Sequence, residues 1–214
     1  MKSSVFRFCR LAVPVLIGAV ALSGCAGFSD SFQQKEEAAP YFLTQQPRAC
    51  VDKVGVNGRF SIYYKTKGNE EALHGGFEWE QDKNLISITL LSPLGQEVAK
   101  IEVTPRLTTF IMPGKPPKSA ANAEKLIKSQ LGWTLPVSGL KDWLQGCAVD
   151  ANGKAFIASP DNKEVVTKDK WQINYVSWID GPVMPLPKRI NLIKGKDATD
   201  LDVNMKLVVD EWRF

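Results

Sequence analysis

Apolar and polar residues alternate over most of this chain after Val54, and this period of two limits its fold more than any other feature. Successive side chains of a β-strand point to opposite faces, so alternation is typical of strands with one buried face. Turn residues such as Asp82-Lys83-Asn84 and Pro113-Gly114 separate the alternating runs, which predicts consecutive antiparallel strands. The clearest runs contain Phe60-Ser61-Ile62, Phe77-Glu78-Trp79, Ile86-Ser87-Ile88, Ala99-Lys100-Ile101 and Leu201-Asp202-Val203-Asn204-Met205-Lys206-Leu207.

Two segments lack this alternation and are predicted to be helices. Strong helix formers without a β-branched cluster occupy the region near 119–130. Pro136 suits the first turn of a second helix near 136–145, and Gly146 suits its end. No repeat, low-complexity tract or linker divides residues 54–214. We therefore expect a single domain there, mainly antiparallel β with helices on one side.

A sheet of this many strands is expected to curl, and its interior can be filled by side chains or kept hollow. Helices around Leu126, Leu140 and Trp143 would cover that interior. An apolar stripe of this kind is more typical of a packed core than of a ligand cavity, so both interpretations stay open. The strand residues expected to point inward are Phe60, Ile62, Phe77, Trp79, Ile88, Leu90, Ile101, Val103, Met205 and Leu207.

Residues 1–24 have the layout of a secretory signal. Three cations precede an apolar run over 11–22, which is shorter than the roughly 20 residues that a spanning helix needs. The run ends in Leu22-Ser23-Gly24-Cys25, which looks like a bacterial lipobox and predicts that Cys25 is lipidated. The alternative is a plain signal peptide that ends near a cysteine.

The residues after Cys25 predict where the lipidated chain is held. By the sorting rule for bacterial lipoproteins, an Asp directly after the lipidated cysteine retains the protein at the inner membrane, and Ala26 stands there instead. Several acyl chains give stable anchoring, so we expect the chain to be tethered to the outer membrane and to face the periplasm. Residues 25–53 would then form the lipidated N-terminus and a tether with, at most, a short helix.

Cys50 and Cys147 are the two cysteines that remain outside the leader and the lipobox. The periplasm is oxidising, so an even pair favours a disulfide. Two buried, unpaired thiols are the alternative, because the sequence does not report whether the two α-carbons approach within about 7 Å.

The sequence contains no recognisable catalytic, metal-binding or nucleotide-binding motif. The net charge of +4 becomes about +1 without the three leader cations, which argues against a nucleic-acid partner. His74 is the one histidine, and no nucleophile, zinc, phosphate-loop or dinucleotide motif occurs. Glu78 and Glu80 share a strand face that is expected to meet water. We therefore expect no enzyme activity, no metal and no cofactor, and any transport would have to proceed downhill.

The segment Pro93-Leu94-Gly95 connects two predicted strands and carries a leucine where a polar turn is usual. Leu94 could fold back into the core, or it could be an exposed tip that inserts into lipid. The sequence pattern leaves both open.

A set of short motifs occurs in a fixed order from about Gly58 to Trp212. These motifs are Gly58-Arg59-Phe60, Gly76-Phe77-Glu78-Trp79-Glu80-Gln81, Pro93-Leu94-Gly95, Leu131-Gly132-Trp133-Thr134-Leu135-Pro136-Val137, Leu140, Trp143, Gly146, Pro185-Leu186-Pro187-Lys188-Arg189-Ile190 and Lys206-Leu207-Val208-Val209-Asp210-Glu211-Trp212. In order and spacing they resemble those of the outer-membrane lipoprotein receptor LolB family. Two features depart from this resemblance, namely the Cys50 and Cys147 pair and a proline-interrupted segment before Cys50.

This resemblance implies an unclosed antiparallel β-barrel around a hydrophobic cavity that helices cover, the architecture shared by LolA and LolB. It implies a monomer that accepts the acyl chains of triacylated lipoproteins from the periplasmic carrier LolA. It further implies energy-independent insertion into the inner leaflet of the outer membrane, assisted by a protruding loop that falls on Pro93, Leu94 and Gly95. The alternative is a lipid-anchored structural or assembly protein of the envelope, whose solid β domain binds protein instead of acyl chains.

Overall fold

The computed structural model describes residues 50–66, 69–181, 184–195 and 201–214. The leader, Cys25 and the tether up to residue 49 lie outside these residues. The first half of the described chain forms β1 (Val54–Thr66), β2 (Asn69–Asp82), β3 (Leu85–Leu91), β4 (Glu97–Val103), β5 (Thr108–Ile111), β6 (Lys118–Ala120), α1 (Ala123–Leu131) and α2 (Val137–Trp143). The second half forms β7 (Cys147–Val149), β8 (Ala155–Ile157), β9 (Glu164–Val166), β10 (Trp171–Ile179), β11 (Leu186–Gly195) and β12 (Leu201–Arg213).

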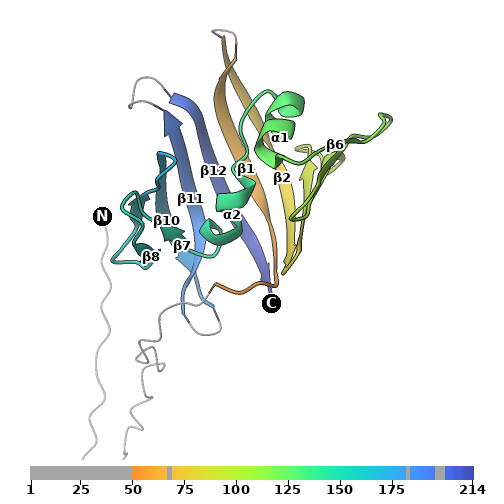
Figure 1. Cartoon of the computed structure of the whole chain (residues 1–214). Coiled ribbons are helices and arrows are strands. Elements are labelled where there is room, and N and C mark those ends of the chain that lie inside the picture. Colours follow the sequence, from red (N-terminus) through yellow and green to blue (C-terminus); the bar gives the residue numbers. More distant parts are fainter. Residues whose placement is uncertain (1–49, 67–68, 182–183, 196–200) are drawn as a thin grey trace, which may run out of the picture. The chain divides into compact units, whose positions relative to one another are not determined.

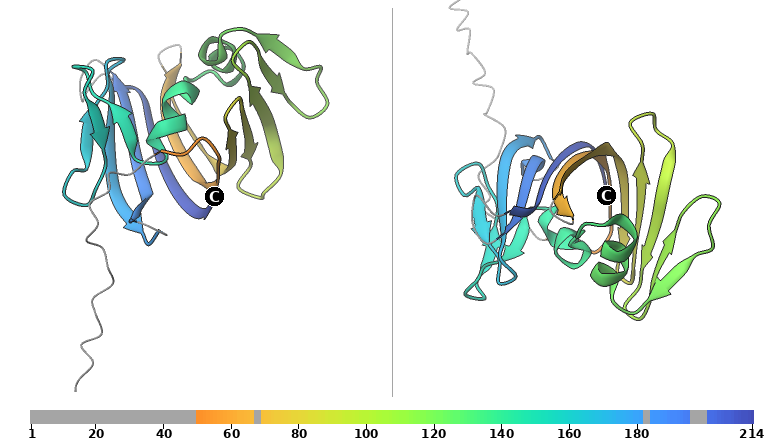
Figure 2. Two further views of the ribbon diagram at one scale, coloured as in Figure 1. Left: turned by 60° about the horizontal axis from the view of Figure 1, so that its bottom comes forward. Right: turned by 90° about the horizontal axis from the view of Figure 1, so that it is seen from above.

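Ten of the strands form one antiparallel sheet in the order β6-β5-β4-β3-β2-β1-β12-β11-β10-β9. Neighbours in the sheet are neighbours in the chain except at the centre, where β1 pairs with β12. The sheet curves strongly, and α1 and α2 lie in the space between its two limbs (Figures 1 and 2). Its edge strands β6 and β9 do not pair with each other, so the barrel is unclosed. The fold class expected from the sequence is confirmed.

The period of two has the expected consequence for burial. Phe60 and Ile62 on β1 lie opposite Leu207 and Met205 on β12, and all four side chains are buried. The intervening residues, such as Ser61 opposite Lys206, face the outside of the sheet. Each strand thus gives one face to a common apolar core and the other to solvent.

The start of the first helix differs from the sequence-based expectation. Lys118–Ala120 pairs with β5 as strand β6, so the helix expected near 119–130 begins at Ala123. Asn122 fixes this start, because its Oδ1 accepts a hydrogen bond from the backbone N of Lys125 at 2.8 Å. Gly132 ends the helix in the left-handed conformation with φ of 86°.

The remaining strands and helices are short. β7 and β8 form a separate two-stranded sheet, and α2 begins after Pro136. Among the residues that the structure describes, no helix has the length and apolar character to cross a membrane.

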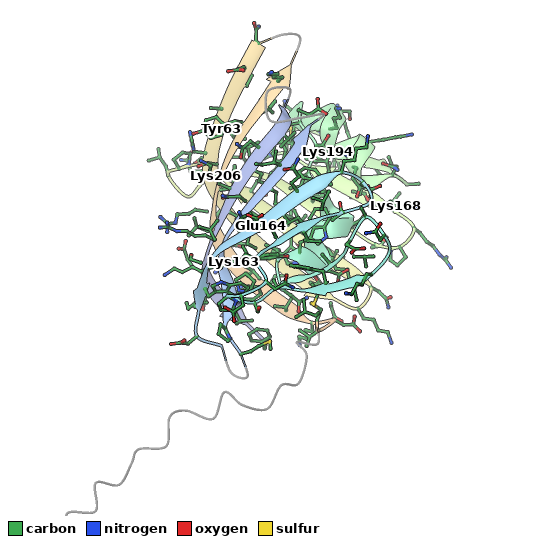
Figure 3. All side chains as sticks on the ribbon, turned by 90° about the vertical axis from the view of Figure 1, so that its left-hand side faces the viewer. Tyr63, Lys163, Glu164, Lys168, Lys194 and Lys206 are labelled. Atoms are coloured by element: carbon green, nitrogen blue, oxygen red, sulfur yellow. A yellow bond between two sulfur atoms is a disulfide. The ribbon has the colours of Figure 1, made fainter. Side chains whose placement is uncertain are left out.

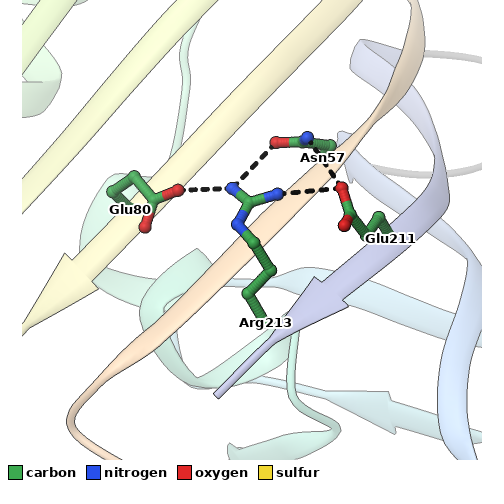
Figure 4. A network of polar contacts seen from close by, with 4 residues as sticks. All are labelled: Asn57, Glu80, Glu211 and Arg213. Atoms are coloured by element: carbon green, nitrogen blue, oxygen red, sulfur yellow. Dashed lines mark hydrogen bonds and ion pairs between the residues drawn. The ribbon is translucent and has the colours of Figure 1, made fainter.

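Arg213 joins three strands on the outer face of the sheet (Figure 4). Its guanidinium donates to Asn57 Oδ1 at 3.0 Å, to Glu211 Oε2 at 3.0 Å and to Glu80 Oε1. Asn57 Nδ2 in turn donates to Glu211 Oε2 at 3.1 Å. These contacts fasten the end of β12 to β1 and β2, although the residues lie far apart in the chain.

Candidate functional site

An apolar cavity lies between the concave face of the sheet and the helices. Its walls come from β1, β2, β3 and β12, from the connection between α1 and α2, and from α2 with the residue after it. Its volume is about 30 Å³, which is room for only a few water molecules. The lining side chains are Phe60, Ile62, Phe77, Trp79, Ile88, Leu90, Trp133, Leu135, Leu140, Leu144, Met205 and Leu207.

Nine of the thirteen residues expected to line a cavity lie in this wall. The other four do not reach it. Ile101, Leu126 and Trp143 are buried in the surrounding core, and Val103 is partly buried against that core.

Three wall residues were missed by the sequence analysis. Trp133 and Leu135 lie in the connection between the helices, where neither a helical nor a strand period applies. Leu144 stands four residues after Leu140, and the helical period places these two on one face. This spacing could have predicted Leu144 as a wall residue.

The helices are held over the cavity by a few polar contacts and by packing. The Oε1 atom of Glu124 on α1 accepts hydrogen bonds from the Oγ of Ser138 at 2.6 Å and from the backbone N of Ser138 at 3.3 Å. Tyr175 Oη on β10 donates to the carbonyl oxygen of Trp143 at 3.0 Å. Neither α1 nor α2 takes part in the hydrogen-bonded ladders of the sheet.

Two buried glutamines fasten the arm over 50–53 to the domain. Gln145 accepts from the backbone N of Val51 at 2.9 Å and donates to the carbonyl oxygen of Val51 at 3.0 Å. Gln81 Nε2 donates to the same oxygen at 3.3 Å and accepts from Trp79 Nε1 at 3.2 Å. The arm, the sheet and the end of α2 therefore share one polar network at the wall of the cavity.

A disulfide joins Cys50 to Cys147, with the two α-carbons 6.4 Å apart. Of the two alternatives left by the sequence, the structure has the bridged form. The bond ties the arm to the first residue of β7, directly after α2, and so stands beside the glutamine network.

The connection between β3 and β4 is a tight turn with Leu94 at its tip. The Oγ of Ser92 accepts from the backbone N of Leu94 at 3.3 Å and of Gln96 at 3.2 Å. Gly95 adopts a φ of 79°, which favours glycine. The side chain of Leu94 is 87% exposed, so it does not fold back into the core. Ser92 was not singled out in the sequence, although serine is a common first residue of such turns.

The comparisons with known sequences agree on one family. A family model described as "Outer membrane lipoprotein LolB" matches residues 52–212. The outer-membrane lipoprotein LolB of Cupriavidus pinatubonensis is 34% identical over 94% of this chain and 94% of its own length. The LolB protein of Pseudomonas fluorescens is 30% identical over 89% of this chain and 90% of its own length.

The comparison with solved structures gives more distant similarities. The crystal structure of the LolA superfamily protein NE2245 from Nitrosomonas europaea has a TM-score of 0.43 at 9% identity, covering 78% of this chain and 88% of that chain. The fold class therefore rests on the strand order described above, and the family rests on the sequence. This chain belongs to the LolB family of outer-membrane lipoproteins.

Proposed function

We propose that this chain receives lipoproteins from the periplasmic carrier LolA and inserts them into the inner leaflet of the outer membrane. It acts as a monomer and a receptor, not as an enzyme. The observation that carries the proposal is the cavity, whose twelve lining side chains are all apolar and come from both the sheet and the helical segment that covers it. Hydrocarbon is the chemistry that such a wall accepts.

The cavity has to enlarge before it can hold an acyl chain. Its 30 Å³ of free volume offers no room for a chain of many methylenes. Leu140 and Leu144 approach from the α2 side, whereas Ile88 and Met205 belong to the sheet. Acyl chains would replace the contacts between these two sides, with a gain of about 0.8 kcal/mol for each buried methylene.

The direction of transfer follows from relative affinity, since the sequence has no nucleotide-binding motif. Cargo would pass from the carrier to this cavity and then to the bilayer, each step binding hydrocarbon more favourably than the one before. The exposed Leu94 supports the last step. Burial of one leucine side chain in lipid contributes roughly 1.5–3 kcal/mol, which helps insertion but does not trap the receptor.

Cys25 anchors the chain in this proposal, and this residue lies outside the described part. Mass spectrometry of the mature N-terminus is the direct measurement. We expect a triacylated cysteine as the first residue. An unmodified cysteine, or cleavage at another bond, would contradict the anchor.

Binding of a fluorescent fatty acid to the chain carrying Cys25→Ser tests the cavity. Ile88→Phe adds bulk to the wall and should weaken binding severalfold, while circular dichroism reports whether the variant is folded. Val98→Phe on the solvent side of β4 is the matched control and should bind as the parent does. Normal binding by a folded Ile88→Phe protein would remove Ile88 from the cavity wall. Failure of the parent chain to bind the probe would favour the solid, protein-binding domain instead.

A further inference from the structure

A second, larger hollow lies on the outer face of the sheet, opposite the apolar cavity. Its volume is about 720 Å³, and it opens to solvent. Outward residues of β1, β2, β11 and β12 form its floor, and the turn between β3 and β4 forms one wall through Ser92, Pro93 and Gly95. We call this hollow the outer groove. The turn that borders it is the one that exposes Leu94.

Three cations surround one apolar position in the floor of this groove. Val208 on β12 lies opposite Arg59 on β1 and opposite Arg189 on β11, so the two arginines flank it on the same face. Lys206 stands two residues before Val208 and therefore also faces outward. Neighbouring strands are about 4.8 Å apart, so the three residues occupy neighbouring positions of the outer face, and all three line the groove.

Most of this positive charge is not neutralised by the protein. Arg59 forms an ion pair with Asp210 at 2.8 Å, and this pair holds the pKa of Asp210 below its ordinary value. Among the described residues, no carboxylate forms an ion pair with Arg189 or Lys206. Lys206 Nζ instead lies 6.0 Å from the centre of the Tyr63 ring. Figure 3 labels both residues. Like charges gathered on one sheet face are unfavourable, and an anion placed among them relieves the repulsion.

The remaining lining of the groove combines apolar side chains with the polar Ser61, His74, Ser92 and Asn191. Leu91 and Pro93 stand on the loop side, and Val176 and Val208 stand on the side of β10 and β12. A site with cations in its floor and hydrocarbon in its walls fits an amphiphile with a negative head. A simple inorganic anion would leave the apolar walls unused.

We propose that the outer groove binds the phosphate headgroup of an anionic membrane phospholipid, with the phosphate between Arg189 and Lys206. This deepens the proposed function, on which it rests for the idea that the β3–β4 turn meets the bilayer. The headgroup would hold the outer face of β1, β12 and β11 against the membrane while Leu94 enters the acyl layer beside it. The groove thereby sets the orientation in which cargo is released.

Vesicle binding by the full mature chain with Cys25→Ser tests this proposal, because the missing anchor no longer masks weaker contacts. Vesicles of phosphatidylcholine alone are compared with vesicles that also contain phosphatidylglycerol. The parent should bind the phosphatidylglycerol vesicles more tightly. The double variant Arg189→Gln, Lys206→Gln should lose about tenfold or more of that affinity, since each cation near an anionic surface contributes on the order of fivefold.

The matched control removes the same net charge elsewhere. Lys154→Gln, Lys168→Gln alters two exposed lysines that do not line the groove, and Figure 3 places Lys168 on the side opposite Lys206. This control should bind phosphatidylglycerol vesicles nearly as the parent does. An equal loss in both double variants, or no loss in the groove variant, would overturn the proposal. So would release of the parent from vesicles by inorganic phosphate beyond the effect of sodium chloride at equal ionic strength, because the groove would then be a site for free anions.

Fatty-acid probe binding separates this proposal from the proposed function. The groove variant leaves all cavity residues in place, so it should bind the probe as the parent does. Loss of vesicle binding with intact probe binding supports the groove. If the parent still preferred phosphatidylglycerol vesicles but no variant bound the fatty-acid probe, the acyl-chain cavity would be contradicted and the groove would not.

Discussion

Substitution of Leu94 should impair delivery of cargo to the membrane without destabilising the fold. Its side chain is 87% exposed, so Leu94→Glu should change the free energy of unfolding by no more than about 0.5 kcal/mol. The carboxylate opposes entry into lipid, so transfer of cargo from the receptor to liposomes should slow at least tenfold while uptake from the carrier is unchanged.

Leu107→Glu is the control for this experiment. Leu107 is 47% exposed in the turn between β4 and β5, away from the outer groove. The Leu107→Glu variant should transfer cargo to liposomes at the rate of the parent. Equal slowing by both variants would assign the effect to charge in general and would remove the special role of Leu94.

Asp210 offers a pH-dependent test at the edge of the outer groove. The hydrogen bond from Arg59 is the main cause that lowers its pKa, and Lys188 adds a smaller lowering. A carboxyl with a lowered folded-state pKa stabilises the fold above its unfolded pKa and loses that contribution as pH falls through the folded value. Asp210→Asn should therefore cost about 0.2–1 kcal/mol of stability at pH 7, as expected for an exposed pair.

Chemical denaturation at several pH values checks this expectation. The gap between parent and Asp210→Asn should shrink below about pH 4, near the ordinary pKa of an aspartate. The same variant frees Arg59, so it should bind phosphatidylglycerol vesicles more tightly than the parent. A stability gap that persists at pH 2 would show that the loss does not come from the charge.

At single residues, the sequence predicted which apolar side chains are buried better than it predicted which polar groups form hydrogen bonds. The apolar wall residues were readable because alternation alone assigns a face to each side chain. Gln81 lies on the same inward face as Phe77 and Trp79, but a buried glutamine needs hydrogen-bond partners. Its partner Val51 lies thirty positions away in the chain, so the sequence pattern did not predict that Gln81 is buried. Gln145 depends on the same distant backbone group and was missed for the same reason.

Helix α2 has only seven residues, so its stability comes from packing more than from helix propensity. A Cβ at Gly139 would collide with the ring of Trp143, which is itself buried 5.9 Å from the ring of Trp171. Gly139→Ala should therefore destabilise the domain by about 1–3 kcal/mol.

Thermal unfolding of a double-mutant cycle with Trp143→Phe measures this effect. The smaller ring leaves room for the added methyl group, so Gly139→Ala should cost less in the Trp143→Phe background than in the parent. An equal cost in both backgrounds would show that the ring does not determine the need for glycine.

The Cys50–Cys147 bond closes a loop with a sequence separation of 97 residues. Constraining the unfolded chain over such a distance typically stabilises a fold by about 2–4 kcal/mol. Reduction should lower the urea midpoint of the parent by a corresponding amount. The double variant Cys50→Ala, Cys147→Ala should have the lower midpoint already and should not respond to the reductant. A midpoint that reductant leaves unchanged in the parent would contradict a stabilising bond.

The long elements were predicted from the sequence, whereas the short strand β6 was not. β1 and β12 each have thirteen residues, and their alternation is unambiguous. β6 has three residues and was expected to be the start of a helix, because its neighbours are strong helix formers. Its pairing with β5 decides the conformation, and the pattern of a three-residue segment does not contain that pairing.

For the molecule as a whole, the sequence left open whether the barrel is hollow or filled. In the structure, the apolar cavity between the sheet and the helices has a volume of about 30 Å³. Packing against helices depends on the shapes of Trp133, Leu135 and Leu144, which no period in the strands predicts. The family resemblance implied the cavity, and under the proposed function cargo would have to displace the cover.

The place of β12 in the sheet has a consequence for the order of events during synthesis and export. This strand follows all the other described strands in chain order, yet it lies between β1 and β11 in the middle of the sheet. Contacts across its ladder with β1, such as Asn57 with Glu211, span 154 positions. Until β12 arrives, β1 and β11 both present unpaired inner edges, and such edges pair readily with other chains. Newly translocated molecules that lack this final strand should therefore be the fraction most prone to aggregation and proteolysis.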